Sequence, residues 1–175
     1  WKNFPETQNI YGAKSDAYHR GQWRDMYPED KLAQIRELVE CGKKNNVELV
    51  WTAHVGGNID MGSEEDYQAV VKKFDQLYEA GVRQFGLFYD DAGSDNTYLT
   101  EFINRLNREY IHQKEGVKNL IVCPQHYNKN QANDAYFAKL AAFDEDVQIM
   151  WTGDAVISEV DPEMMDYIES KINRP

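Results

Sequence analysis

Short apolar runs alternate along the chain with stretches in which apolar residues recur at helical spacing. The strand-like runs cover residues 9–14, 47–55, 82–90, 118–124 and 147–153. Four of them are nearly continuous in apolar character rather than strictly alternating, which is typical of strands that are buried on both faces of a parallel sheet.

Each strand-like run is followed by a pattern that predicts a helix. Between residues 63 and 81 the apolar positions 67, 70, 71, 74, 77 and 78 fall on one face of a helix,. Ser63 is placed to cap its start and Gly81 to end it. Similar patterns begin near Pro28, Tyr98, Asn133 and Asp161, with Asn133 as a predicted cap,.

The regular alternation of strand and helix predicts an α/β fold with a parallel sheet. A doubly wound nucleotide-binding sheet is disfavoured, because no G-x-G-x-x-G turn follows the first strand and no P-loop occurs,. A (β/α)8 TIM barrel needs eight units, and about five are present. We therefore predict that residues 1–175 form a single domain that is part of a longer (β/α)8 barrel, with five strands that are parallel and in chain order.

Composition narrows the choice of partners. The chain has 175 residues and a net charge of −11, which argues against binding to nucleic acid or to an anionic membrane surface,. No apolar run is long enough to suggest membrane insertion,. The two cysteines, Cys41 and Cys123, allow one disulfide at most, so this is not a disulfide-stapled scaffold,.

Polar residues gather where the predicted strands end. In a barrel the carboxyl ends of all strands meet at one mouth, where function is located. We expect the following residues to converge there: Lys14, His54, Asp90, Asp91, Cys123 to Tyr127, Trp151 and Thr152.

Adjacent carboxylates at Asp90 and Asp91 are the most informative of these residues. Two close carboxylates do not ionise independently, so the pair offers both an anion and a general acid. The alternative is that Asp91 simply caps the following turn. Neighbours on a regular strand point to opposite faces, so the chain must leave strand geometry near Asp91 if both serve one site.

Other chemistries have weaker support. The segment 90–96 fails the spacing of a calcium loop, and the four histidines form no H-x-x-x-H pair, so no metal is expected,. No G-x-S-x-G elbow occurs, although a pair of Cys123 with His126 is conceivable. Tryptophans near the strand ends, Trp23, Trp51 and Trp151, would suit a sugar ring or core packing equally well.

Several segments resemble glycoside hydrolase family 84, the β-N-acetylglucosaminidases that include the O-GlcNAcases. "YGAKSDAYHRGQWRDMYPEDKLAQIRELVECGKKNNVELVWTAHVGGNID" is similar to that family's second and third βα units. "KFDQLYEAGVRQFGLFYDDAG" resembles the fourth strand with its Asp-Asp pair, and "LIVCPQHYN" and "VQIMWTGDAVIS" resemble the fifth and sixth. The resemblance runs from about residue 9 to residue 175.

This resemblance implies retaining hydrolysis of β-linked N-acetylglucosamine in which the substrate's acetamido oxygen attacks the anomeric carbon and forms an oxazoline. Asp90 would orient the acetamido group and stabilise the oxazoline. Asp91 would protonate the leaving oxygen and then activate water. No cofactor is implied, and the substrate would be a glycan or glycoprotein. Residues expected to contact the sugar are Lys14, Cys123, Tyr127, Thr152 and Val156.

The sequence departs from the family pattern at several positions. Gly-Ala-Lys at 12–14 stands where the family has Ala-Pro-Lys, and Gln-His at 125–126 replaces Thr-Glu. About three barrel strands have no counterpart, so the isolated chain is expected to be inactive or to need the remainder of the barrel as a partner. A non-catalytic carbohydrate-binding or scaffold domain is the alternative. The resemblance favours a secreted or periplasmic bacterial protein.

Overall fold

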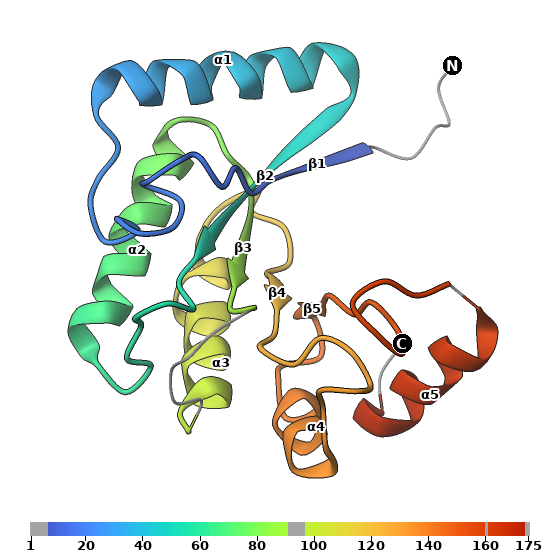
Figure 1. Cartoon of the computed structure of the whole chain (residues 1–175). Coiled ribbons are helices and arrows are strands. Elements are labelled where there is room, and N and C mark those ends of the chain that lie inside the picture. Colours follow the sequence, from blue (N-terminus) through green and yellow to red (C-terminus); the bar gives the residue numbers. More distant parts are fainter. Residues whose placement is uncertain (1–6, 91–96, 160, 174–175) are drawn as a thin grey trace.

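The computed structural model describes residues 7–90, 97–159 and 161–173. Five strands alternate with five α-helices, and a short 3₁₀ helix follows α3. In Figure 1 the helices follow one another around the strands, from α1 at the top through α2, α3 and α4 to α5 at the lower right. The bounds are β1 Thr7–Tyr11, α1 Glu29–Asn45, β2 Val47–His54, α2 Glu64–Glu79, β3 Gln84–Phe88, α3 Leu99–Glu109, η1 Ile111–Gln113, β4 Ile121–Cys123, α4 Asp134–Ala141, β5 Gln148–Ile149 and α5 Pro162–Ile172.

The strands form one parallel sheet in the order β1-β2-β3-β4-β5. The prediction of parallel strands in chain order is therefore confirmed, as is the α/β class expected of part of a (β/α)8 barrel. Strand β3 lies at the centre, and Gly86 in its middle allows the close approach of both neighbours. A Cβ at Gly86 would lie 2.8 Å from Thr52 Cγ2 and 3.2 Å from the carbonyl oxygen of Ile121.

Local signals explain where the helices begin and end. Ser63 caps α2 by accepting a hydrogen bond from the backbone N–H of Asp66, and Asn133 caps α4 through Tyr136 N–H. Gly81 follows α2 with φ of 100°, a left-handed conformation that glycine adopts without strain,. Each of these predictions is confirmed, whereas Pro28 lies just before α1 rather than inside its first turn.

The ends of the outer strands differ from the sequence prediction. Strand β1 covers residues 7–11 rather than 9–14, so Lys14 lies in the turn beyond the strand. Strand β5 is limited to residues 148–149 rather than 147–153. Both lie at edges of the sheet, where each has a single neighbour among the described strands, so pairing sustains fewer residues than the apolar pattern suggests,.

The core lies between the sheet and the helices and is rich in aromatic rings. Phe74 of α2 stacks on Phe85 of β3 with ring centroids 4.5 Å apart, and Trp51 packs edge-on against Phe74. Trp51 and Trp23 are 0% and 1% exposed, so both serve packing rather than contact with a sugar.

The loop between β1 and α1 is fastened by a buried polar cluster. The carboxylate of Asp16 accepts hydrogen bonds from Tyr11 and Tyr27 hydroxyls, at 3.0 and 2.6 Å, and from the N–H of Tyr18. Lys73 of α2 is 1% exposed and donates to the carbonyls of Tyr18 and Asp25. Burial lowers the pKa of Lys73 to about 8. These bonds fix the loop that leads away from Lys14.

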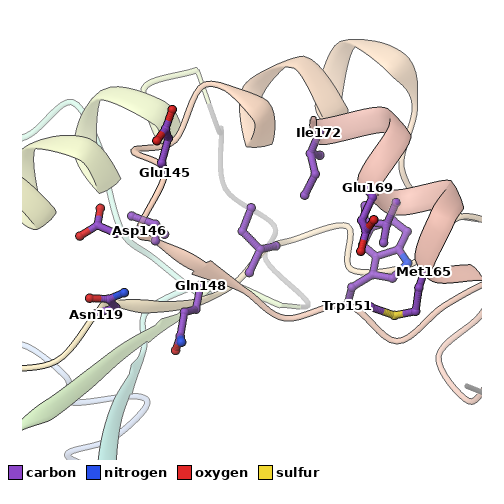
Figure 2. Close-up of a pocket in the computed structure, with 11 residues that line it drawn as sticks. Asn119, Glu145, Asp146, Gln148, Trp151, Met165, Glu169 and Ile172 are labelled. Atoms are coloured by element: carbon purple, nitrogen blue, oxygen red, sulfur yellow. The ribbon is translucent and has the colours of Figure 1, made fainter. Parts of the chain in front are cut away.

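A hollow of about 400 Å³ borders the outer edge of β5 and the inner face of α5. Figure 2 shows Trp151 beside Met165 and Glu169 of α5, with Glu145 and Asp146 at the other end of the hollow. Trp151 is half-buried here, so this indole lies at the rim of the sheet rather than in the core. Across the residues that the structure describes, no helix is long and apolar enough to cross a membrane.

Candidate active site

The carboxyl ends of the parallel strands bring most of the predicted site residues to one edge of the sheet. His54 is the last residue of β2 and lies opposite Phe88, the last residue of β3, in the strand register. Asp90 follows β3 by two residues, and Cys123 is the last residue of β4. Hydrogen bonds from Val55 N–H to Phe88 and from Tyr89 N–H to Cys123 extend the pairing of the three strands toward Asp90.

Asp90 lies in a turn, because regular strand geometry ends at Phe88. This departure from the strand agrees with the expectation that the chain must bend near the acid pair. Asp91, the second member of the pair, lies outside the described residues, as do Asp95 and Asn96. The geometry of the site therefore rests on Asp90.

The carboxylate of Asp90 faces the imidazole of His54. Oδ1 of Asp90 lies 3.4 Å from Nε2 of His54, and the Asp90 side chain is 24% exposed. That separation is within ion-pair distance, but none of the described residues donates an aligned hydrogen bond to this buried oxygen. One acceptor oxygen of Asp90 is thus buried without a hydrogen bond from the described residues.

Electrostatics keep this carboxylate ionised. Burial raises the pKa of Asp90, but polar and charged neighbours, among them the cation of Arg20, outweigh burial, so its pKa lies below the ordinary value,. An aspartate in this state is an anion at neutral pH and acts as an acceptor or as a stabiliser of positive charge.

Arg20 is a residue of the site that sequence reasoning missed. Its Nη2 lies 2.5 Å from Nε2 of His54, although the two residues are 34 positions apart. His19, next to it in the chain, is buried and donates from Nδ1 to the carbonyl of Thr52 at 2.6 Å. A lone arginine in a loop carries no local signal that would have identified it.

The loops after β4 and β5 are joined side by side at the same edge of the sheet. Thr152 donates from its backbone N–H to the carbonyl of Tyr127 at 3.0 Å, and Lys129 N–H donates to Gly153. The Thr152 hydroxyl contacts the carbonyls of Tyr127 and Ala155. Tyr127 and Thr152 are therefore brought together, as expected.

The other residues predicted to contact the sugar lie farther from Asp90 or are more exposed. Val156 is 56% exposed, and Lys14 is exposed in the turn after β1, two strands away from β3. Cys123 is half-buried at the end of β4. The structure places all three near the carboxyl edge without bringing Lys14 or Val156 into contact with Asp90.

Two of the residues considered for other chemistries are placed by the structure, whereas the acidic segment 91–96 lies outside the described residues. The imidazole of His126 packs on the ring of Tyr136, with centroids 4.7 Å apart, which occupies it in packing. Cys41 and Cys123 form no disulfide. Among residues 7–90, 97–159 and 161–173, no group of three His, Cys, Asp or Glu side chains is arranged to hold a metal ion.

Comparison with known proteins shows which family of sequences and structures this chain resembles. Residues 3–175 match the sequence model of a family described as beta-N-acetylglucosaminidase. Protein O-GlcNAcase from Mus musculus and from Rattus norvegicus are each 23% identical to the chain over 181 residues. The solved structures of CpGH84B and CpGH84D superpose with TM-scores of 0.90 and 0.88, at 35% and 33% identity.

These matches cover nearly all of this chain but a minor part of the relatives. The alignments span 94% of the chain and 20% of each O-GlcNAcase. The structural matches span 96% of the chain and 32% and 30% of the two solved chains. Because the family model covers almost every residue, the chain belongs to the β-N-acetylglucosaminidase family, glycoside hydrolase family 84.

Proposed function

We propose that this chain supplies the catalytic carboxylates of a glycosidase that removes β-linked N-acetylglucosamine from a glycan or glycoprotein. The reaction would retain the anomeric configuration, with the substrate's acetamido oxygen as nucleophile. The observation that carries the proposal is Asp90, an ionised carboxylate at the carboxyl edge of a parallel sheet with one buried oxygen that receives no hydrogen bond from the described residues.

Asp90 has the properties that the acetamido group requires. Its free Oδ1 would accept the acetamide N–H, which turns the carbonyl oxygen toward the anomeric carbon. Positive charge develops on the acetamido group as the oxazoline forms, and the Asp90 anion would stabilise it. Asp91 would protonate the departing oxygen and then take a proton from water.

Sugar contacts would come from the neighbouring strand ends. Tyr127 and Thr152 lie together beside β4 and β5, and Cys123 ends the strand next to Asp90's own. We propose that these three border the acetyl group with Val156, and that Lys14 contacts the sugar from the side of β1.

A series of substrates with fluorinated acetyl groups tests the mechanism in the complete enzyme. Fluorine withdraws electrons and weakens the acetamido oxygen as a nucleophile, so kcat/KM should fall steadily from the acetyl to the trifluoroacetyl glycoside. The corresponding 2-hydroxy glucoside, which lacks the nucleophile, should be hydrolysed far more slowly. Rates that do not depend on the acyl group would contradict substrate assistance.

The alternative is a non-catalytic carbohydrate-binding or scaffold domain. Such a domain would bind N-acetylglucosamine without hydrolysing any glycoside in the series. The lowered pKa of Asp90 favours the enzyme. A site that only binds the sugar could accept the amide N–H with a neutral oxygen and would not need a buried anion.

Residues 1–175 expressed alone should hydrolyse a fluorogenic N-acetylglucosaminide much more slowly than the full-length protein. The chain spans about a third of the solved relatives, and the hollow beside β5 exposes apolar surface of Trp151 and Met165. We propose that the remainder of a barrel covers this edge and completes the sugar site. A monomeric, cooperatively melting chain with full activity would contradict the proposal.

A further inference from the structure

Arg20 reaches the site from a loop that is fixed independently of the site. The loop is fastened through Asp16 and Lys73, and the carbonyl of His19 accepts the backbone N–H of His54 at 2.9 Å. Arg20 is therefore anchored next to the end of β2, and its guanidinium meets the ring nitrogen that also faces Asp90.

The contact between Arg20 and His54 determines which nitrogen of the imidazole carries a proton. A guanidinium has only donors and stays charged in proteins, so at 2.5 Å the Nε2 atom must accept the hydrogen bond,. His54 is then a neutral ring protonated at Nδ1, and Nε2 has no proton to donate to Asp90. This explains why Oδ1 of Asp90, 3.4 Å away, receives no hydrogen bond from the ring.

We propose that Arg20 is a positioning residue that acts through His54: it keeps Nε2 occupied and thereby leaves Oδ1 of Asp90 to accept the substrate's acetamide N–H. This inference rests on the proposed function, because it assigns Arg20 to the same reaction. If Nε2 carried a proton instead, His54 would donate to Oδ1 and compete with the substrate for that oxygen.

The titratable and charged groups around Asp90 come from three parts of the chain. His54 lies at the end of β2, Arg20 lies in the loop after β1, and Asp91 is the chain neighbour outside the described residues. Behind His54 lies the buried ring of His19, 6.2 Å away between centroids, and burial lowers the pKa of His19. Arg20 is the permanent cation among them, since its charge persists across the working pH range.

Arg20→Met and Arg20→Lys in the full-length enzyme test the proposal by kinetics. Arg20→Met should lower kcat by roughly 10–100-fold with little change in KM, because a His54 that donates to Oδ1 of Asp90 would leave the acetamido group misplaced for oxazoline formation. Without the cation the pKa of Asp90 rises, so the acid limb of kcat/KM should move to higher pH. Arg20→Lys, which keeps the charge and a donor, should restore most of kcat and the position of the limb.

A matched control removes an arginine that plays no part in the site. Arg36 on α1 is exposed and pairs with Glu29, so Arg36→Met should leave kcat and the acid limb unchanged. Equal losses in Arg20→Met and Arg20→Lys with an unmoved acid limb would show that Arg20 only packs the loop, and would overturn the inference. Wild-type kinetics in Arg20→Met would overturn it as well.

Histidine-selective ¹⁵N NMR of the full-length protein provides a readout that does not depend on activity. We expect His54 to be protonated at Nδ1 in the wild type and to gain an Nε2-protonated form in Arg20→Met. A wild-type ring protonated at Nε2 would overturn the inference. If the wild-type protein hydrolyses no N-acetylglucosaminide, the proposed function fails, while the NMR result still decides the pairing of Arg20 with His54.

Discussion

Asp90→Asn in the complete enzyme should lower kcat/KM by roughly 10²–10⁴-fold for every N-acetylglucosaminide, whatever its leaving group. Oxazoline formation is common to all such substrates, and the asparagine cannot balance the positive charge that develops on the acetamido group. Its side chain can also present an amide N–H where an acceptor is needed. The measurement is a parallel set of rates with an activated aryl glycoside and with an alkyl glycoside.

Asp134→Asn is the matched control for this substitution. Asp134 lies in the first turn of α4, where its exposed carboxylate pairs with Lys171. The same loss of one negative charge there should leave the rates unchanged. Thermal melting of both variants separates an effect on the reaction from an effect on folding. Retention of wild-type rates in a folded Asp90→Asn variant would remove Asp90 from the mechanism.

Asp91→Asn should discriminate between leaving groups. Glycosides with poor leaving groups need protonation of the departing oxygen and should lose roughly 10²–10⁴-fold in kcat/KM. Activated aryl glycosides leave without help, so their first step should be affected little. The loss should therefore grow with the pKa of the leaving alcohol across a substrate series.

Azide provides a second measurement for Asp91→Asn. Hydrolysis of the oxazoline requires a base to activate water, whereas azide is already an anion and opens the ring without one. Added azide should raise the turnover of activated substrates by the variant and yield a β-glycosyl azide. Equal losses for good and poor leaving groups, with no effect of azide, would contradict the acid–base assignment of Asp91.

The central part of the fold was predictable from the sequence because its burial leaves a local pattern. Strands β2 and β3 are flanked by two neighbours each, and their nearly continuous apolar runs follow directly from burial on both faces. Caps such as Ser63 and Asn133 were predictable because they act within three residues. The extents of β1 and β5 depend on pairing at the sheet edge, which no local pattern encodes.

The site was predictable only in its outline. The ends of strands located Asp90, His54 and Thr152, since parallel strands bring their carboxyl ends to one edge. Arg20 could not be identified, because its role depends on a contact across 34 residues. The burial of Lys73 could not be predicted either. Lys73 follows Lys72 on a helix, as a solvated lysine would, and its ammonium group is buried by the loop that packs over it.

The strictly sequential order of the sheet has a consequence for the synthesis of the protein. Each strand pairs with the strand made just before it, and the starts of β2, β3, β4 and β5 are separated by 37, 37 and 27 residues. At translation rates of roughly 5–20 residues per second, the newest strand waits about 1–7 s on the ribosome for its next neighbour. From β1 to β5 the sheet can thus grow one strand at a time, and at each stage the newest strand presents an edge that is open to mispairing with other nascent chains.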